Sequence, residues 1–140
     1  MAQPARVKSR SSEAMRLKAQ KKTDFEQEFY QSLFSEALDG IFVCDQRGKY
    51  LNVNPRGRQM LGYTRREILR MSLSDVIPPE HLKTNPIRMT DLLAGKTVVN
   101  ERRLRCKNGR LLHVEISAWM LSNGNLVGIV RDISEQKATE

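Results

Sequence analysis

The stretch DGIFVCDQRGKYLNVN, residues 39–54, contains two strand-like runs that are joined by a very short connection. Three further apolar-alternating runs follow a helical region, at residues 97–105, 110–121 and 126–133. Alternation with a period of two is typical of strands that bury one face. The sequence therefore predicts two strands, then helices, then three strands. This order is not that of a typical enzyme.

The connections between these runs carry turn residues. The first two runs are joined by Asp45-Gln46-Arg47-Gly48, and the last three are joined through Asn108-Gly109 and Asn123-Gly124. Asn-Gly between alternating runs is a strong hairpin signal, because both residues tolerate the positive φ of a type I′ turn. We therefore expect three hairpins, the latter two with type I′ turns.

The charge of the chain is concentrated near its N-terminus. The 140 residues carry a net charge of +8, and residues 1–22 hold seven Lys or Arg against Glu13 alone. Low apolar content there predicts a disordered, solvated tail or a frayed helix. The alternative is an arm for nucleic acid or anionic lipid. No aromatic residue is interleaved with the basic ones, which argues against a platform for stacking single-stranded bases.

The cysteine usage and the hydropathy favour a cytoplasmic protein. No apolar run approaches the roughly 18 residues of a membrane span, and no apolar segment follows the basic N-terminus as it would in a signal peptide. The two cysteines, Cys44 and Cys106, have no spacing that suggests a disulfide framework. With His81 and His113 they also lack the paired spacing of a zinc site, so we predict no metal and no catalytic residue.

Residues 23–38 are expected to form an amphipathic helix that begins at a capping box, Thr23-Asp24-Phe25-Glu26. Its apolar residues form two adjacent ridges, so the apolar face is unusually wide. We expect this face to form a homodimer, with these residues in the contact: Phe25, Phe29, Tyr30, Leu33 and Phe34. The alternative is a helix that simply lies on its own sheet.

The region between the second and third strands contains helix signals. Helices are expected at 54–62, which begins with Asn-Pro, and at 64–70, which begins with a second capping box. Residues 72–83 are expected to be irregular. A further helix is expected at 85–94, with Gly95 as its C-terminal stop.

The run at 110–121 alternates most cleanly and defines an inner and an outer face of the sheet. We expect an inner face made of Leu112, Val114, Ile116, Ala118 and Met120. Trp119 and Leu121 then lie on the outer face and need a cover, either the helix at 23–38 or a partner subunit.

Residues 25–140 resemble a PAS domain with its PAC extension, the sensory module of bacterial histidine kinases, diguanylate cyclases and transcription regulators. The matching stretches occur in the order of the family: 37–41, 53–55, 61–69, 101–109 and 130–134. The resemblance implies an α+β fold with a five-stranded antiparallel sheet in the order 2-1-5-4-3. It also implies short helices on one face that enclose a pocket, with residues 39–134 as the core and 135–140 as the start of a C-terminal signalling helix.

The implied strand order has two consequences. It places Cys44 and Cys106 three strand spacings apart, about 14 Å, which is beyond the roughly 7 Å limit for a disulfide. The same separation excludes a catalytic Cys-His pair. The resemblance further implies that Asp132-Ile133-Ser134 is the variant here of the family's Asp-Ile-Thr motif, through which signals pass to the C-terminal helix.

The expected pocket is built mainly from apolar residues that would face the interior in any case. We predict its lining to be Ile41, Val43, Leu51, Met60, Ile77, Ile87, Leu92, Asn100, Arg102, Val114, Ile116, Ala118, Leu126, Gly128 and Val130. Asn100 and Arg102 share a face with Val98 and Leu104. If that face points inward, the two polar side chains can fix a polar or anionic ligand. If the strand is bulged, Arg102 reaches the solvent instead.

The sequence gives no positive sign of a cofactor. The photosensing flavin class needs a cysteine that residues 71–88 do not supply. The haem class places its axial histidine where Asn85 stands here, and His81 falls about one turn early. We therefore predict no cofactor, with haem or FAD as alternatives.

Together these features predict a cytoplasmic PAS sensor or dimerisation module that performs no catalysis. It would bind a small ligand or a partner and regulate an output domain, such as a kinase or cyclase, in cis or in trans. The alternatives are a nucleic-acid-binding regulator that uses the basic tail and a haem or flavin redox sensor.

Overall fold

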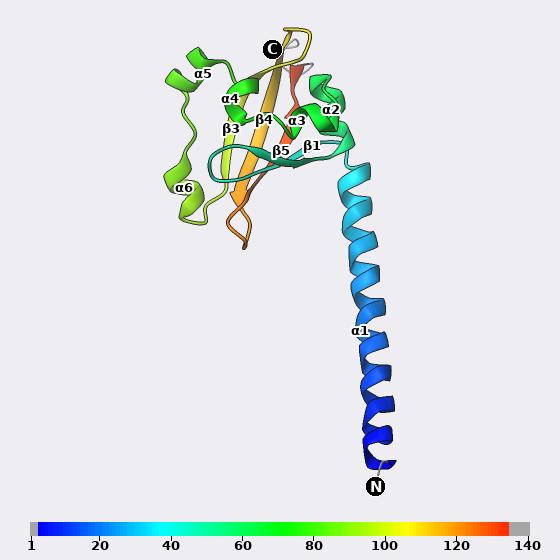
Figure 1. Cartoon of the computed structure of the whole chain (residues 1–140). Helices are drawn as coiled ribbons and strands as arrows, with labels where there is room; N and C mark the ends of the chain where they lie inside the picture. The colour runs from blue at the N-terminus through cyan, green and yellow to red at the C-terminus, as the bar shows by residue number, and fades with distance from the viewer. Residues whose placement is uncertain (1–2, 135–140) are drawn as a thin grey trace. The chain divides into compact units, whose positions relative to one another are not determined.

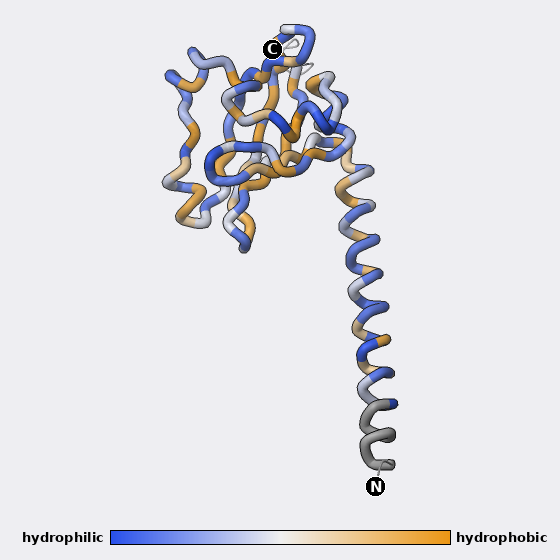
Figure 2. The backbone as a smooth tube through the Cα atoms, in the orientation of Figure 1, coloured by the Kyte–Doolittle hydropathy of each residue, from blue (hydrophilic) through white to orange (hydrophobic). Residues whose placement is uncertain are grey.

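The computed structural model describes residues 3–134, with side chains from residue 10 onward (Figure 1). The chain divides into a helical N-terminal unit that ends at Phe34 and a second unit that begins at Ser35. Apolar residues gather in the strands of the second unit, whereas most of the first unit is polar (Figure 2). No helix among the described residues combines the length and the apolar character that a membrane span requires.

The second unit is built on one antiparallel sheet of five strands. Its strands are β1 (Gly40–Cys44), β2 (Tyr50–Val53), β3 (Val98–Arg105), β4 (Leu111–Met120) and β5 (Leu126–Asp132). The spatial order is β2-β1-β5-β4-β3, which confirms the expected topology. Because β5 pairs with both β1 and β4, the first hairpin and the last strand lie in one continuous layer.

Five short helices connect β2 to β3: α2 (Pro55–Leu61), α3 (Arg65–Ile68), α4 (Leu73–Val76), α5 (Pro79–Thr84) and α6 (Met89–Leu93). The first two confirm the helices expected from the Asn-Pro and capping-box signals. The Thr64 hydroxyl accepts from the Glu67 N–H at 3.1 Å, and the Glu67 carboxylate accepts from the Thr64 N–H at 2.9 Å. These reciprocal bonds satisfy two N–H groups that a helix start otherwise leaves without partners.

The expectation for residues 72–94 was partly wrong. Residues 72–83, expected to be irregular, contain α4 and α5, because the Asp75 carboxylate accepts from the Ser72 N–H at 2.8 Å and Pro79 opens α5. The helix expected to begin at Asn85-Pro86 begins only at Met89. The carbonyls of Asn85 and Pro86 instead accept hydrogen bonds from Arg102, a long-range contact that local sequence does not reveal.

The hairpin turns have a different geometry from the expected type I′. No described non-glycine residue has a positive φ, so Asn108 and Asn123 are not left-handed, whereas Gly109 has φ +87° and Gly124 has φ +91°. The Gly109 N–H donates to the Cys106 carbonyl at 2.9 Å, which makes a three-residue loop. The Asn108 side chain accepts from the Arg110 N–H at 2.9 Å. This local bond holds Asn108 as a turn residue and leaves the left-handed position to glycine.

The N-terminal unit belongs to one long helix, α1 (Gln3–Glu36). This helix includes most of the segment that we expected to be a disordered tail, and Thr23 does not begin it. The Thr23 hydroxyl donates to the Ala19 carbonyl at 3.0 Å, as a residue inside a helix can. Residues 10–22 contain no Gly or Pro and are mostly good helix formers, so nothing in them stops the helix.

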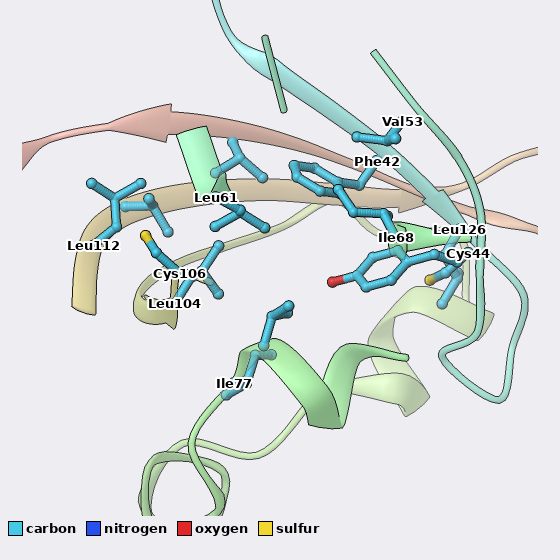
Figure 3. Close-up of a cluster of buried hydrophobic side chains, with 14 of the residues drawn as sticks. Phe42, Cys44, Val53, Leu61, Ile68, Ile77, Leu104, Cys106, Leu112 and Leu126 are labelled. Carbon is cyan, nitrogen blue, oxygen red and sulfur yellow. The ribbon is translucent and has the colours of Figure 1, made fainter. Parts of the chain in front are cut away.

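The core of the second unit lies between the sheet and the short helices. Figure 3 shows its buried side chains, among them Phe42 of β1, Ile68 of α3 and Leu104 of β3, gathered in one cluster. The rings of Phe42 and Tyr50 lie 5.6 Å apart. The inner residues of β4 join this cluster as the alternation predicted, while Trp119 lies on the outer face beside Val127 and Leu121 is 36% exposed.

One buried polar side chain holds the first hairpin to α2. Asn54 is fully buried, and its side-chain oxygen accepts from the Ile41 N–H at 2.8 Å and from the Gly57 N–H at 2.9 Å. Its amide nitrogen donates to the Asp39 carbonyl at 3.0 Å. Asn54 therefore caps α2 and at the same time ties that helix to the start of β1.

Replacing Asn54 should destabilise the fold strongly. Asn54→Ala leaves buried backbone groups without partners and removes the cap of α2, so we expect the free energy of unfolding to fall by about 2–4 kcal/mol. Asn108→Ala is the matched control, because it removes one exposed hydrogen bond and should cost less than about 1 kcal/mol. Chemical denaturation measures both, and equal losses would contradict this role of Asn54.

Candidate functional site

A cavity of about 90 Å³ lies between the inner face of the sheet and the segments that contain α4 and α6. Ten of the residues predicted to line a pocket do line it: Ile77, Ile87, Leu92, Asn100, Arg102, Ile116, Ala118, Leu126, Gly128 and Val130. Strands β3, β4 and β5 supply the floor, and the segment of residues 87–92 supplies much of the cover. The walls are mostly hydrocarbon, which is typical of small-molecule sites.

Five of the predicted residues do not line the cavity. Ile41 and Val43 face the opposite side of the sheet, because Gly40, Phe42 and Cys44 are the buried positions of β1. Leu51 is 41% exposed on β2. The remaining two, Met60 and Val114, pack in or against the core cluster away from the cavity.

The prediction therefore placed the wrong alternate residues of β1 on its inner face. The surroundings of Gly40 explain the observed orientation. A Cβ atom at Gly40 would lie 2.9 Å from the Met60 sulfur, closer than real contacts allow, and 3.1 Å from the Gly57 Cα, which is tighter than most real contacts. Gly40 must face α2, and Phe42 and Cys44 follow it inward at every second position. Gly40, which precedes the apolar run, was the sequence signal that could have identified the inner face of β1.

The sequence prediction also missed several lining residues: Phe42, Cys44, Tyr50, Leu73, Arg88, Val98, Leu104 and Val127. Three of them, Cys44, Tyr50 and Arg88, carry ionisable groups, and the Arg88 guanidinium pairs with the Asp91 carboxylate at 2.8 Å. Burial, with a smaller effect of Asp45, raises the pKa of the Cys44 thiol to about 11, and burial also raises the pKa of Tyr50. Both groups are therefore neutral at pH 7. A neutral, buried thiol is a poor nucleophile, so the cavity does not have the character of a cysteine active site.

The polar side of the cavity is formed by β3. This strand pairs with β4 without a register shift, and Asn100 lies opposite Ile116 while Arg102 lies opposite Val114. Residues directly opposite each other share a face, so Asn100 and Arg102 both point inward. Arg102 is only 3% exposed. The interpretation in which a bulge lets Arg102 reach the solvent is wrong.

The guanidinium of Arg102 is held by two backbone carbonyls. Nη1 donates to the Asn85 carbonyl at 2.7 Å, and Nη2 donates to the Pro86 carbonyl at 3.3 Å. Within the described part of the chain it makes no ion pair with a carboxylate. Burial lowers the pKa of Arg102 from its usual value, but an arginine keeps its charge at neutral pH. The cavity therefore contains a buried positive charge without an anionic partner among residues 10–134.

His81 is not part of the cavity lining. Its Nε2 atom is buried and has no hydrogen-bond partner among the described residues, and burial lowers its pKa, with further contributions from Arg102 and Arg103. Asn85, which the resemblance led us to align with the axial histidine of the haem class, donates from its amide to the Glu101 carbonyl at 3.4 Å. Between residues 10 and 134 no three His, Cys, Asp or Glu side chains are grouped as a metal site would require.

The end of β5 is fixed by local hydrogen bonds. The Ile133 N–H donates to the His113 carbonyl at 3.1 Å, and Ile133 is 6% exposed. The Asp132 carboxylate accepts from the Ser134 N–H at 2.9 Å. These bonds set the direction in which the chain leaves the sheet. Residues 135–140, expected to begin a signalling helix, lie outside the described residues.

A family model described as a PAS domain matches residues 38–135. The chain belongs to the PAS domain family. PAS domains are sensory modules of signal transduction, and the strand order and the cavity of this PAS domain agree with that assignment.

Two curated relatives of this PAS domain are sensors. It is 28% identical over 115 residues to the methyl sulfide methyltransferase-associated sensor of Methanosarcina acetivorans. It is 25% identical over 118 residues to the sensor histidine kinase TmoS of Ectopseudomonas mendocina. Each match covers 79% of this chain but only 12% of the relative, so the chain spans a small part of their length.

Solved structures share the fold. A domain of a sensory box sensor histidine kinase/response regulator from Geobacter sulfurreducens is 34% identical and has a TM-score of 0.69, with 79% of this chain and 96% of that chain covered. The PAS domain of an HTR-like protein from Haloarcula marismortui has a TM-score of 0.71 at 22% identity, with 83% and 98% covered.

Proposed function

We propose that this PAS domain is a non-catalytic sensor module that binds a small molecule in its cavity and regulates an output domain, in cis or in trans. The observation that supports this function best is the cavity itself, which is formed by the same strands that lead to the end of the domain. Ile116 and Ala118 of β4 and Val130 of β5 line it. The two buried, unpaired cysteines, Cys44 and Cys106, favour work in the cytoplasm.

The route of the signal would follow β4 and β5. Val130 of β5 lies opposite Ile116 of β4. Two residues further along β5, Asp132 lies opposite Val114. A ligand that shifts these strands changes the position of Asp132, Ile133 and Ser134, and with them the path of the chain that follows. A packing change worth 1–2 kcal/mol alters a two-state equilibrium by a factor of roughly 5–30, which is sufficient for regulation.

We also propose that the module acts as a homodimer through α1. Several large apolar side chains of this helix are exposed within its own unit, with exposures of 69% at Phe25, 52% at Phe29, 65% at Tyr30 and 54% at Leu33. Burying one such side chain contributes about 1.5–3 kcal/mol. A second copy of the helix presents a matching surface, which is the usual arrangement of a two-fold dimer.

The dimer should depend on the apolar face of α1. Phe29→Glu places a charge in the proposed contact, so light scattering at micromolar concentration should show a monomer where the wild type is a dimer. Gln31→Glu is the matched control, because it adds the same charge to the polar side of the helix and should leave the dimer intact. A monomeric wild type, or equal effects of both substitutions, would contradict the proposal.

The exit of the signal should depend on Asp132. Asp132→Ala removes the acceptor for the Ser134 N–H, a bond worth about 1 kcal/mol, so hydrogen exchange at that amide should accelerate about fivefold. The sheet should keep its protection. Asp132→Asn, which retains an acceptor oxygen, should show a much smaller effect. Faster exchange throughout the sheet would show that Asp132 is needed for the fold as a whole. Unchanged exchange at the Ser134 amide would contradict the proposed role of Asp132 in the signal exit.

A further inference from the structure

The inner face of β3 is chemically unlike the rest of the cavity. β4 and β5 present hydrocarbon to it, and β1 and β2 add the neutral Cys44 thiol and Tyr50 phenol. β3 instead presents the Asn100 amide and the Arg102 guanidinium at alternate positions between Val98 and Leu104. All four side chains share one face of a regular strand. The cavity is therefore most polar at β3, whereas the rest of its lining is mostly apolar, with Cys44, Tyr50 and the Asp91-paired Arg88 as the exceptions.

The charge on that wall is only partly satisfied. A guanidinium has five N–H donors in a fixed fork, and the described residues provide two acceptors, the carbonyls of Asn85 and Pro86. Carbonyls are neutral, so they leave the positive charge of a side chain that is 97% removed from solvent without a counter-charge. A buried charge is costly unless it is paired with an opposite charge.

Asn100 supplies a second, independent observation. It is half-buried, lines the cavity, and makes no side-chain hydrogen bond within the described part of the chain. It is one inward position away from Arg102 on the same strand. An amide N–H and a guanidinium on adjacent inward positions are donors suited to one carboxylate.

The size of the cavity limits what accompanies that carboxylate. An apolar cavity of about 150 Å³ is sufficient for benzene, so the about 90 Å³ available here fits a tail of only a few carbons. The part of the floor beside β3, which includes Ile116, Ala118 and Leu126 of β4 and β5, is apolar and offers such a tail no polar partner. The ligand should therefore be charged at one end and aliphatic at the other.

We propose that the cavity binds a short-chain aliphatic monocarboxylate, with the carboxylate at Arg102 and Asn100 and the tail against β4 and β5. This inference rests on the proposed sensor function and names the ligand class of the same site. The carboxylate supplies the counter-charge that the protein itself does not provide, and its bond to the guanidinium is charge-assisted.

The test is a calorimetric titration of the full chain with butyrate, 1-butanol and butylammonium, which share one tail and differ in charge. Butyrate should bind saturably, butanol on the order of tenfold or more weakly, and butylammonium not at all. Equal binding of butanol and butyrate, or binding of butanol alone, would overturn the carboxylate assignment while leaving a small-molecule sensor. Failure of butyrate to bind would overturn the inference without affecting the dimer and exit tests.

Variants of β3 locate the site. Arg102→Gln should weaken butyrate binding about tenfold or more and leave butanol binding unchanged. Arg103→Gln is the matched control, because Arg103 is the next residue of the strand and is exposed on the outer face. If Arg102→Gln does not fold, Asn100→Leu and the three-ligand comparison on the wild type still decide the matter. Unchanged butyrate binding in folded Arg102→Gln would overturn the proposed site.

Discussion

The site depends on the pair of hydrogen bonds from Arg102 to the carbonyls of Asn85 and Pro86. These bonds join the middle of β3 to the segment between α5 and α6, which covers the cavity. They also explain why α6 begins only at Met89, since the carbonyls before it are turned toward the strand. A ligand that binds the remaining donors of the same guanidinium would act directly on the cover, so binding and conformational change would be linked at one side chain.

The sheet connects this point to the end of the domain. β4 contacts β3 on one side and β5 on the other, and it carries two cavity residues, Ile116 and Ala118. The same strand provides the His113 carbonyl that accepts from the Ile133 N–H. In the proposed function, a shift of β4 would reach the exit through main-chain hydrogen bonds. The effect needs only a small difference in packing, because the free energies that separate two states of a domain are a few kcal/mol.

Much of the fold could be predicted from the sequence because the signals are local. The alternation of β4 identified its inner face, and the caps of α2 and α3 identified their first residues. The errors have equally physical origins. The close approach of α2 to Gly40 decides which residues of β1 face inward, and Arg102 delays the start of α6. Both are long-range contacts. The turn type was missed because Asn108 bonds to its own loop.

The candidate site could be predicted in part for the same reason. Most apolar lining residues are core positions that periodicity reveals, whereas the burial of Arg102 required the regular pairing of β3 with β4. The helix propensities of residues 10–22 favour a helix, but their high charge led us to expect a disordered tail or a frayed helix.

If the proposed site is correct, an anion bound at Arg102 changes the end of β5. Hydrogen–deuterium exchange of the full chain with and without saturating butyrate measures this effect. We expect slower exchange in two separate places, the cover at residues 87–92 and the amides of Ile133 and Ser134, with α1 residues 10–34 unchanged. Bound butyrate that leaves both places unaltered would contradict this expectation.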